Sequence, residues 1–353
     1  MTTSYRQDRP SEPGPADLVR LRVRAPADLL ATIPFLLGFH PSESLVVLFL
    51  RGGRVVLSAR YDLPGGGPEG GAGSADLLVA PVDDLVAQHG VTGLVLVAYC
   101  TDADRGRAVL AEHQAHQQGA ELLDVLLVDG ERWWSLACTT GCCPAEGAAY
   151  APAEHPLSAE AVWAGLVAQP DRASVVARVA GPPASRWEEM SSRAAAVESG
   201  LPDQGPEARQ AALGAAVVAG LDALRGPEGP HPAAPLDDAA CLELALLVRE
   251  AVVRDVACAL VTREDAARHV ALWQEVVGRV PPDLAPGPLG VLGIAAWADG
   301  NGTLLNACCE RLDLVEPGYP MGRLLSDVSR RALPPSWWDA MADGLRHDLG
   351  LVP

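Results

Sequence analysis

Short apolar runs alternate with longer amphipathic stretches through the first part of the chain. Residues 18–24 alternate apolar and basic side chains, which predicts a half-exposed strand. Residues 44–50 form a continuous apolar run typical of a buried strand, and residues 55–63 follow it after the glycine pair Gly52 and Gly53. Because glycine tolerates the positive φ of a hairpin turn, this pair predicts that the two strands are antiparallel neighbours.

A helix is predicted between the first two strands, since Pro26 suits a first helical turn and Gly38 is a typical C-terminal stop. Further helices are predicted over residues 75–89 and 102–119, and further strands over residues 94–99, 122–128 and 132–138. The order β-α-β-β-α-β-α-β-β predicts a small mixed α/β sheet domain over residues 17–150. Residues 1–16, a tail containing proline and serine, are expected to be disordered.

After Gly147 the pattern changes, and it predicts a larger all-helical domain over residues 151–353. Trp297, Gly300, Ala307 and Pro317 follow one another in an order that resembles one tetratricopeptide-type helix pair. Such a pair cannot bury its own apolar face, so it is expected to stack on its neighbours. The predicted helices cover residues 158–168, 185–199, 206–224, 236–261, 263–278, 288–298, 303–314, 321–332 and 336–347.

Composition narrows the classes of function. The chain has 45 acidic and 27 basic residues and a net charge of −18, which argues against a nucleic-acid partner. No apolar run approaches the roughly 20 residues that cross a bilayer, so no membrane partner is expected. Every basic residue is arginine, and the absence of lysine excludes Schiff-base and Walker-A chemistry within this sequence.

Cysteine usage predicts reduced thiols and a cytoplasmic location, because the eight cysteines show no regular framework spacing and no export signal is evident. Cys138, Cys142 and Cys143 lie close together, and thiolates at such spacing can hold zinc. Four ligands are needed, only three are local, and His155 is the nearby imidazole. The alternative is a packed, reduced loop with a structural role, and no other cofactor is predicted.

Strand directions predict a common edge for several polar side chains. A strand–helix–strand crossover usually joins parallel neighbours and a tight turn reverses direction. The start of strand 44–50 therefore shares an edge with the ends of strands 55–63, 94–99 and 122–128, where open α/β sheets tend to bind ligands. The candidate ligand-binding residues at this edge are His40, Ser42, Glu43, Asp62, Cys100, Asp102 and Arg105.

Each of these residues has a catalytic or binding interpretation and a structural one. His40 is a candidate general base, Ser42 and Glu43 are candidates for orienting a ligand, and Arg105 is a candidate clamp for a carboxylate or phosphate. In the structural alternative, His40 closes the preceding helix, and Asp102 caps the following helix with Arg105 on its solvent face.

Two further features are less specific. Gly65, Gly67 and Gly70 follow a strand in the order of a dinucleotide fingerprint, but the loop is long and no acidic residue ends a following strand, which favours a surface loop. Trp133 and Trp134 fall on a predicted strand, so their rings are expected on opposite faces. The outward ring is expected either to dock the helical half or to form a partner surface.

Several long segments resemble a known family. They are residues 33–41 with Ser44, residues 132–138 with residues 142–147, residues 295–300 and residues 317–319. Together they resemble the actinobacterial domain-of-unknown-function family 4192 over about residues 18–337. The resemblance implies a cytoplasmic actinobacterial protein and supplies no activity.

Two main hypotheses follow. The first is a non-catalytic adaptor or regulatory protein, whose helical half binds a protein partner and whose sheet domain packs structurally or binds a small ligand. The alternative is a hydrolase or transferase with a pocket around His40 and Asp102, although no Gly-x-Ser-x-Gly, His-Glu-x-x-His or P-loop motif is present. A zinc-stabilised domain is a third hypothesis.

Overall fold

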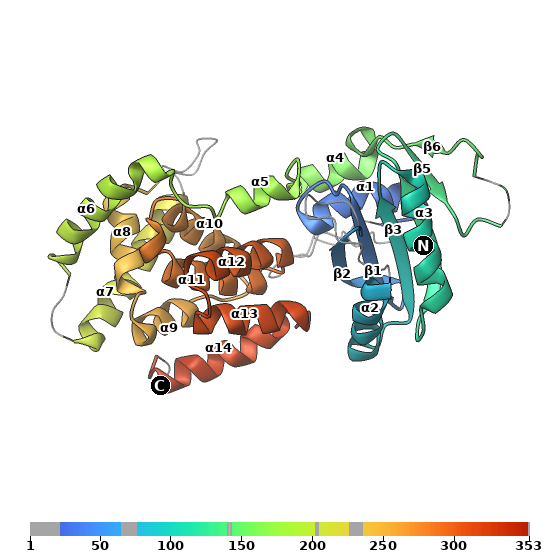
Figure 1. Ribbon diagram of the computed structural model, residues 1–353. Coiled ribbons are helices and arrows are strands. Elements are labelled where there is room, and N and C mark those ends of the chain that lie inside the picture. Colours follow the sequence, from blue (N-terminus) through green and yellow to red (C-terminus); the bar gives the residue numbers. More distant parts are fainter. Residues whose placement is uncertain are drawn as a thin grey trace, which may run out of the picture.

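A computed structural model describes residues 22–64, 76–139, 141, 143–201, 205–225 and 236–351. A six-stranded mixed sheet occupies the N-terminal side, and the following region is mostly helical (Figure 1). This arrangement confirms the predicted fold class. Figure 1 places the sheet with its covering helices on the right, the helices from α6 onward on the left, and α5 between them.

The strand directions are those that the crossover and turn arguments predict. The sheet order is β2-β1-β3-β4-β5-β6, in which β1 is antiparallel to both β2 and β3, and β3 is parallel to β4. Gly52 and Gly53 have φ of 58° and 74°, which allows the tight turn between β1 and β2. The strands are β1 Ser44–Arg51, β2 Arg54–Asp62, β3 Gly93–Tyr99, β4 Glu121–Val128, β5 Arg132–Ser135 and β6 Ala148–Ala149.

Helices cover both faces of the sheet. Val46 and Leu48 of β1 pack under α1 (Pro26–Leu37), whereas Val47 and Phe49 pack under α2 (Asp76–His89) and α3 (Ala103–His116). Double coverage explains why β1 and β3 are apolar at nearly every position. Trp133 and Trp134 of β5 lie on opposite sides, Trp133 in the α1 layer and Trp134 in the α2–α3 layer, as expected for neighbours on a strand.

The predicted strand over residues 18–24 is not a strand at residues 22–24, and its first four positions lie outside the described residues, as do residues 1–16. The backbone N–H groups of Arg24 and Ala25 donate to the Asp28 carboxylate at 2.7 and 3.1 Å and so cap α1. β1 already has a neighbour on each side, which leaves it no edge for this segment.

The sequence pattern also misplaced the end of the sheet. The strand predicted over residues 132–138 ends at Ser135, and the pattern missed β6, which pairs with β5 at Arg132 and Trp133. A two-residue strand is too short to show a period of two. β6 ends at Ala149, before residue 151, where the predicted helical region starts.

The helical region is built around one fully buried helix. α11 (Pro286–Ala298) is buried at every position and packs between α10 and α12. This supports the predicted stacking of neighbouring helices, while the likeness to a tetratricopeptide repeat stays a prediction. The remaining elements are α4 Pro156–Trp163, α5 Arg172–Ala177, α6 Trp187–Glu198, α7 Pro206–Arg225, α8 Asp238–Leu247, α9 Ala251–Ala259, α10 Ala266–Val277, α12 Gly302–Val315, α13 Pro320–Arg330 and α14 Ser336–Asp348, with short 3-10 turns at Pro152–Glu154, Ala184–Arg186 and Pro282–Leu284.

The single helix predicted over residues 236–261 is two helices, α8 and α9, separated by a break at residues 248–250. The break lies where α11 approaches closely. A Cβ on Gly287 would come within 2.6 Å of the Val248 carbonyl oxygen, so only glycine permits this contact. The interruption therefore follows from tertiary packing, which the local pattern does not encode.

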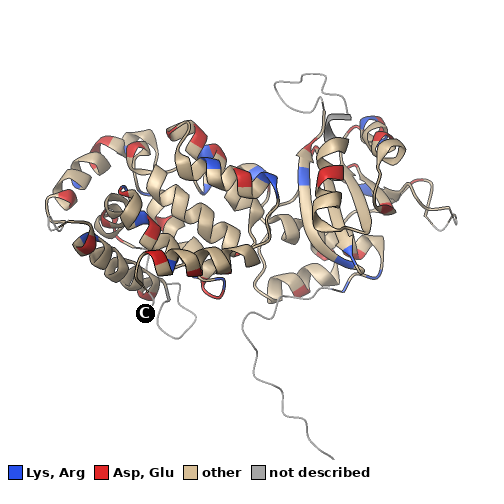
Figure 2. Ribbon diagram, turned by 90° about the horizontal axis from the view of Figure 1, so that it is seen from below, with Lys and Arg blue, Asp and Glu red and all other residues tan. Residues whose placement is uncertain are grey.

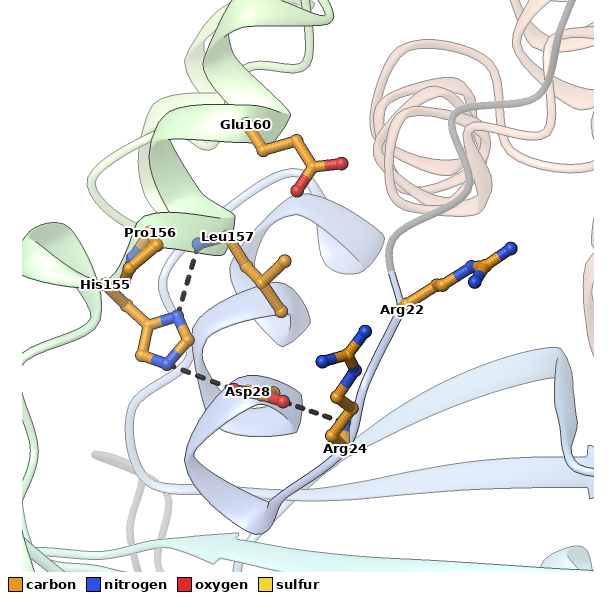
Figure 3. A pocket seen from close by; sticks show the side chains of 7 residues that line it. All are labelled: Arg22, Arg24, Asp28, His155, Pro156, Leu157 and Glu160. Atoms are coloured by element: carbon orange, nitrogen blue, oxygen red, sulfur yellow. Dashed lines mark hydrogen bonds and ion pairs between the residues drawn. The ribbon is translucent and has the colours of Figure 1, made fainter.

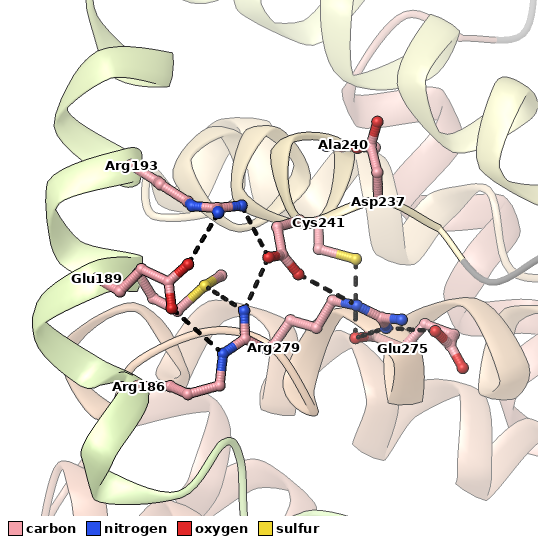
Figure 4. A network of polar contacts seen from close by, with 10 residues as sticks. Arg186, Glu189, Arg193, Asp237, Ala240, Cys241, Glu275 and Arg279 are labelled. Carbon is pink, nitrogen blue, oxygen red and sulfur yellow. Dashed lines mark hydrogen bonds and ion pairs between the residues drawn. The ribbon is translucent and has the colours of Figure 1, made fainter.

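A charged cluster joins three helices of this region (Figure 4). Asp238 of α8 accepts hydrogen bonds from Arg186 at 2.8 Å and Arg193 at 3.0 Å, and Arg279, just beyond the end of α10, lies 3.5 Å away. Beside it, burial raises the pKa of Cys241 to about 12, so this thiol stays protonated. Acidic and basic side chains are otherwise spread over both parts of the molecule (Figure 2).

The sheet and the helical region meet through a few specific contacts. Thr303 of α12 donates to the Leu37 carbonyl at 2.6 Å, and Gln88 of α2 donates to the Arg331 carbonyl at 2.5 Å. Arg172 of α5 forms an ion pair with Glu310 of α12. Within the described ranges, no helix combines the length and apolar character that a membrane crossing requires.

One buried histidine generates a prediction about pH. His113 of α3 is fully buried, neither ring nitrogen has a hydrogen-bond partner among the described residues, and burial lowers its pKa despite the opposing effect of Asp83. When the pH falls below the ordinary histidine pKa of 6.5, the His113 side chain binds a proton more readily in the unfolded chain than in the folded one. Acid therefore favours unfolding.

We expect the free energy of unfolding to fall as the pH decreases from about 7.5 to about 5.5, and His113→Leu to flatten that dependence. Urea denaturation at several pH values measures it. His347→Leu, on an exposed position of α14, is the matched control and should leave the slope unchanged. If the free energy of unfolding depends on pH equally in the wild-type chain and in His113→Leu, buried His113 is not the source of the acid sensitivity.

Candidate functional site

The predicted polar edge of the sheet exists. Residues 40–43 lead into β1, Asp62 ends β2, and Cys100 follows β3 directly. Ser44 pairs with Asp62 on one side and with Tyr99 on the other, so these three chain segments meet at one edge. The structure thus places the predicted residues of this group on neighbouring loops.

Glu43 is the centre of this edge. Its carboxylate accepts hydrogen bonds from the backbone N–H and the hydroxyl of Thr101, at 2.9 and 2.8 Å, and forms an ion pair with Arg105. Its carbonyl oxygen accepts the N–H of Leu63 at 3.1 Å. Glu43 therefore joins the start of β1 to the end of β2 and to the loop between β3 and α3.

The backbone of Glu43 is strained, which indicates that these contacts hold it in place. Its φ is 45°, in the left-handed region that residues other than glycine seldom adopt. Such a conformation persists only where the surrounding structure over-determines it. Charged hydrogen bonds to both carboxylate oxygens supply that constraint, so the side chain acts here as a structural clasp.

Cys100 lies beside the clasp but is not activated by it. Its sulfur is 3.2 Å from Nη2 of Arg105, a position in which a cation would ordinarily stabilise a thiolate. Glu43 neutralises this guanidinium, and burial raises the pKa of Cys100. The thiol therefore remains protonated near neutral pH.

The structural alternative for the following loop is confirmed in one part and wrong in another. Asp102 caps α3 by accepting the N–H groups of Asp104 and Arg105 at 3.1 and 3.2 Å. Arg105 does not lie on the solvent face of the helix, because its side chain is only 27% exposed and turns toward Glu43. The pattern of α3 did not show that this arginine has a partner 62 residues earlier.

The other residues of the edge have separate surroundings. Gly38, with φ of 78°, ends α1, while the His40 N–H donates to the Gln169 carbonyl at 3.0 Å. Asp62 pairs with Arg60 at 2.6 Å and its side chain is 82% exposed. Ser42 is exposed, and its carbonyl accepts the Ser44 hydroxyl. A joint acid–base role for His40 and Asp102 stays a prediction.

The zinc and nucleotide hypotheses fall largely on positions that the structure does not describe. Cys142 and the glycine loop with Gly65, Gly67 and Gly70 lie outside the described residues. Among the described residues, no group of three histidine, cysteine or acidic side chains is arranged to hold a metal. His155 instead lies 3.3 Å from the Asp28 carboxylate and accepts the N–H of Leu157.

A pocket that sequence reasoning missed lies at the start of α1 (Figure 3). Its volume is about 510 Å³, and it opens between the chain that enters α1 and the first turn of α4. Two guanidinium groups and one glutamate side chain project around it in Figure 3. The lining residues are Arg22, Arg24, Asp28, His155, Pro156, Leu157 and Glu160.

α4 lies along α1 and is fixed to it at three levels. His155 contacts Asp28 at the start, the Ser158 hydroxyl faces the Ala31 carbonyl at 3.4 Å in the middle, and Gln169 bonds to the backbone at residues 38–40 beyond the end. Ser158 and Ala161 are the buried residues of α4. Small side chains therefore form the face of α4 that meets α1.

We call this packing of α4 along α1 the α1–α4 seam. It directs the side chain of Trp163 toward solvent. At about 100° per residue, Trp163 projects on the side of the helix opposite to Ser158 and Ala161. Its side chain is 93% exposed, and Val162 and Val167 are 62% and 68% exposed. We call Val162, Trp163 and Val167 the α4 patch.

The apolar run over residues 158–168 predicted a continuous helix but not this exposed surface. In the structure the helix ends at Trp163, and Gly165 has φ of 84° just beyond it. The signal in the sequence is the pair of small residues, Ser158 and Ala161, which are suited to close helix packing. These two residues indicate the buried face of α4 only once it is known that α4 packs against α1.

The clasp generates the second prediction. Glu43→Gln removes the charge that pairs with Arg105 and should lower the free energy of unfolding by about 1–3 kcal/mol. Chemical denaturation of the full chain measures this. Asp62→Asn, at an exposed position of the same edge, is the control and should change stability by less than about 0.5 kcal/mol. A Glu43→Gln chain as stable as that control would show that the clasp does not hold the edge together.

Comparison with known proteins places the whole arrangement in one family. The family model described as "Domain of unknown function (DUF4192)" matches residues 26–336, which include the sheet, the α1–α4 seam and most of the helical region. No curated protein and no solved structure matches the chain. The chain belongs to the DUF4192 family.

Proposed function

We propose that this protein is a non-catalytic adaptor that binds a protein partner through the α4 patch. The observation that carries the proposal is the 93% exposure of Trp163, flanked by two exposed valines within a stretch of six residues. The patch lies in the region after residue 150, where a partner surface was expected from the sequence. The proposal includes the cytoplasmic, actinobacterial setting that the sequence predicts.

The energetics of tryptophan support a binding role. A tryptophan side chain that becomes buried removes about 150–250 Å² from water, and this residue type is enriched at the centres of protein interfaces. In the described structure the Trp163 ring contributes little of that area to the fold. Its burial is therefore available to stabilise a complex.

The state of the sheet edge also favours binding over catalysis. Glu43 has both carboxylate oxygens engaged by Thr101 and Arg105, and burial raises the pKa of Cys100. A general base needs an accessible oxygen, and a cysteine nucleophile needs a thiolate. Glu43 and Cys100 therefore offer a hydrolase or transferase neither a free carboxylate base nor a thiolate nucleophile at this edge.

The third prediction tests the docking surface. A photo-crosslinking amino acid at position 163 of the full chain, expressed in its native cells, should capture a specific protein that mass spectrometry identifies. Calorimetry with that purified protein should then show binding about 30-fold or more weaker for Trp163→Ala, because central tryptophans contribute about 2 kcal/mol or more.

Trp337→Ala is the matched control, since Trp337 is also exposed, at 55%, but lies on α14. It should bind with unchanged affinity. The proposal fails if position 163 captures no specific protein, or if Trp163→Ala binds the captured protein as tightly as the wild-type chain does.

A further inference from the structure

The α4 patch and the pocket beside α1 form one surface. Glu160, which lines the pocket, and Trp163 are three residues apart on α4, so they project from neighbouring positions on the same side of the helix. The pocket lies at the start of α4 (Figure 3), and Trp163 of the patch is the last residue of that helix. A peptide segment that covers Trp163 and runs along α4 toward its start would reach the pocket.

The pocket carries two guanidinium groups without partners. Among the described residues, neither the Arg22 nor the Arg24 side chain forms a hydrogen bond or an ion pair (Figure 3). Many arginines of the molecule are paired, such as Arg105 with Glu43 and Arg279 with Glu275, and Arg54, Arg311 and Arg323, also unpaired within the described part of the chain, do not line this pocket. In a chain with 45 acidic residues, two adjacent unpaired arginines are available to an external anion.

The acidic groups of the pocket differ in what they offer. Asp28 is occupied, because it accepts the N–H groups of Arg24 and Ala25 and lies 3.3 Å from His155. Glu160 is exposed and its carboxylate has no partner among the described residues, so it opposes an incoming acidic group. The charged side chains that line the pocket without a partner in the described structure are therefore two guanidinium groups and one carboxylate.

We propose that the partner segment is an acidic peptide, whose carboxylates pair with Arg22 and Arg24 while an adjacent apolar side chain covers Trp163. This inference rests on the proposed function and names the chemistry of the partner. Charge complementarity carries it: the overall charge of −18 would attract a basic segment, yet the unpaired charges beside the patch include two cations and one carboxylate. Direct ion pairs between the peptide carboxylates and the two guanidinium groups outweigh the repulsion between the peptide and the net negative charge of the protein, because salt screens charges that are far apart.

Selection from a library of random peptides on the immobilised full chain tests this without knowing the partner. Peptides that also bind Trp163→Ala are removed, and the rest are labelled for fluorescence anisotropy. We expect the selected peptides to carry glutamates or aspartates next to an aromatic or aliphatic residue. Arg22→Ser and Arg24→Ser should each weaken their binding by about fivefold, with a smaller salt dependence.

Glu160→Gln should have the opposite effect and tighten peptide binding, because it removes a carboxylate that repels the peptide without altering α4. Arg330→Ser, on the exposed surface of α13, is the control and should have no effect. Selected peptides that are basic, or binding that Arg22→Ser and Arg24→Ser leave unchanged, would overturn the acidic partner while leaving the docking surface in place. If no selected peptide depends on Trp163, the proposed function itself fails.

Discussion

The seam between α1 and α4 is the constraint on which the proposed surface depends. Ser158 and Ala161 allow α4 to lie close along α1, and contacts at Asp28, Ala31 and residues 38–40 fix its position and rotation. Once that rotation is set, helical geometry directs Trp163 away from the protein. The same seam brings the arginines before α1 next to the first turn of α4 and creates the pocket.

The sheet edge and the α4 surface contrast in how their polar groups are used. At the sheet edge, Glu43, Thr101 and Arg105 satisfy one another and hold a strained backbone in place. At the α4 surface, Arg22 and Arg24 have no partner among the described residues. Groups that already satisfy one another stabilise the fold, whereas unsatisfied groups on an accessible surface are available to a ligand. This contrast separates the structural site from the candidate binding site.

Much of the sheet could be predicted from the sequence, because its elements follow from local pattern and chain direction. The glycine pair before Arg54 and the crossover rules gave the strand directions, and these brought Glu43 and Arg105 to one edge. The same local reasoning failed at residues 22–24, where an alternating pattern belongs to a segment that caps α1. It also failed at Val248, where contact with Gly287 interrupts a helix.

The candidate binding surface could not be predicted from the sequence. The apolar pattern around Trp163 is typical of a buried helix, and only the packing of α4 on α1 shows that this side chain is exposed. Labelling the full chain with 5-fluorotryptophan measures its environment directly, since the Trp163 fluorine resonance can be assigned by its loss in Trp163→Phe. The account predicts a large shift of this resonance between H₂O and D₂O in the isolated protein, at least as large as that of Trp337. No solvent shift at Trp163 would mean that the ring is already covered, and would contradict the central claim.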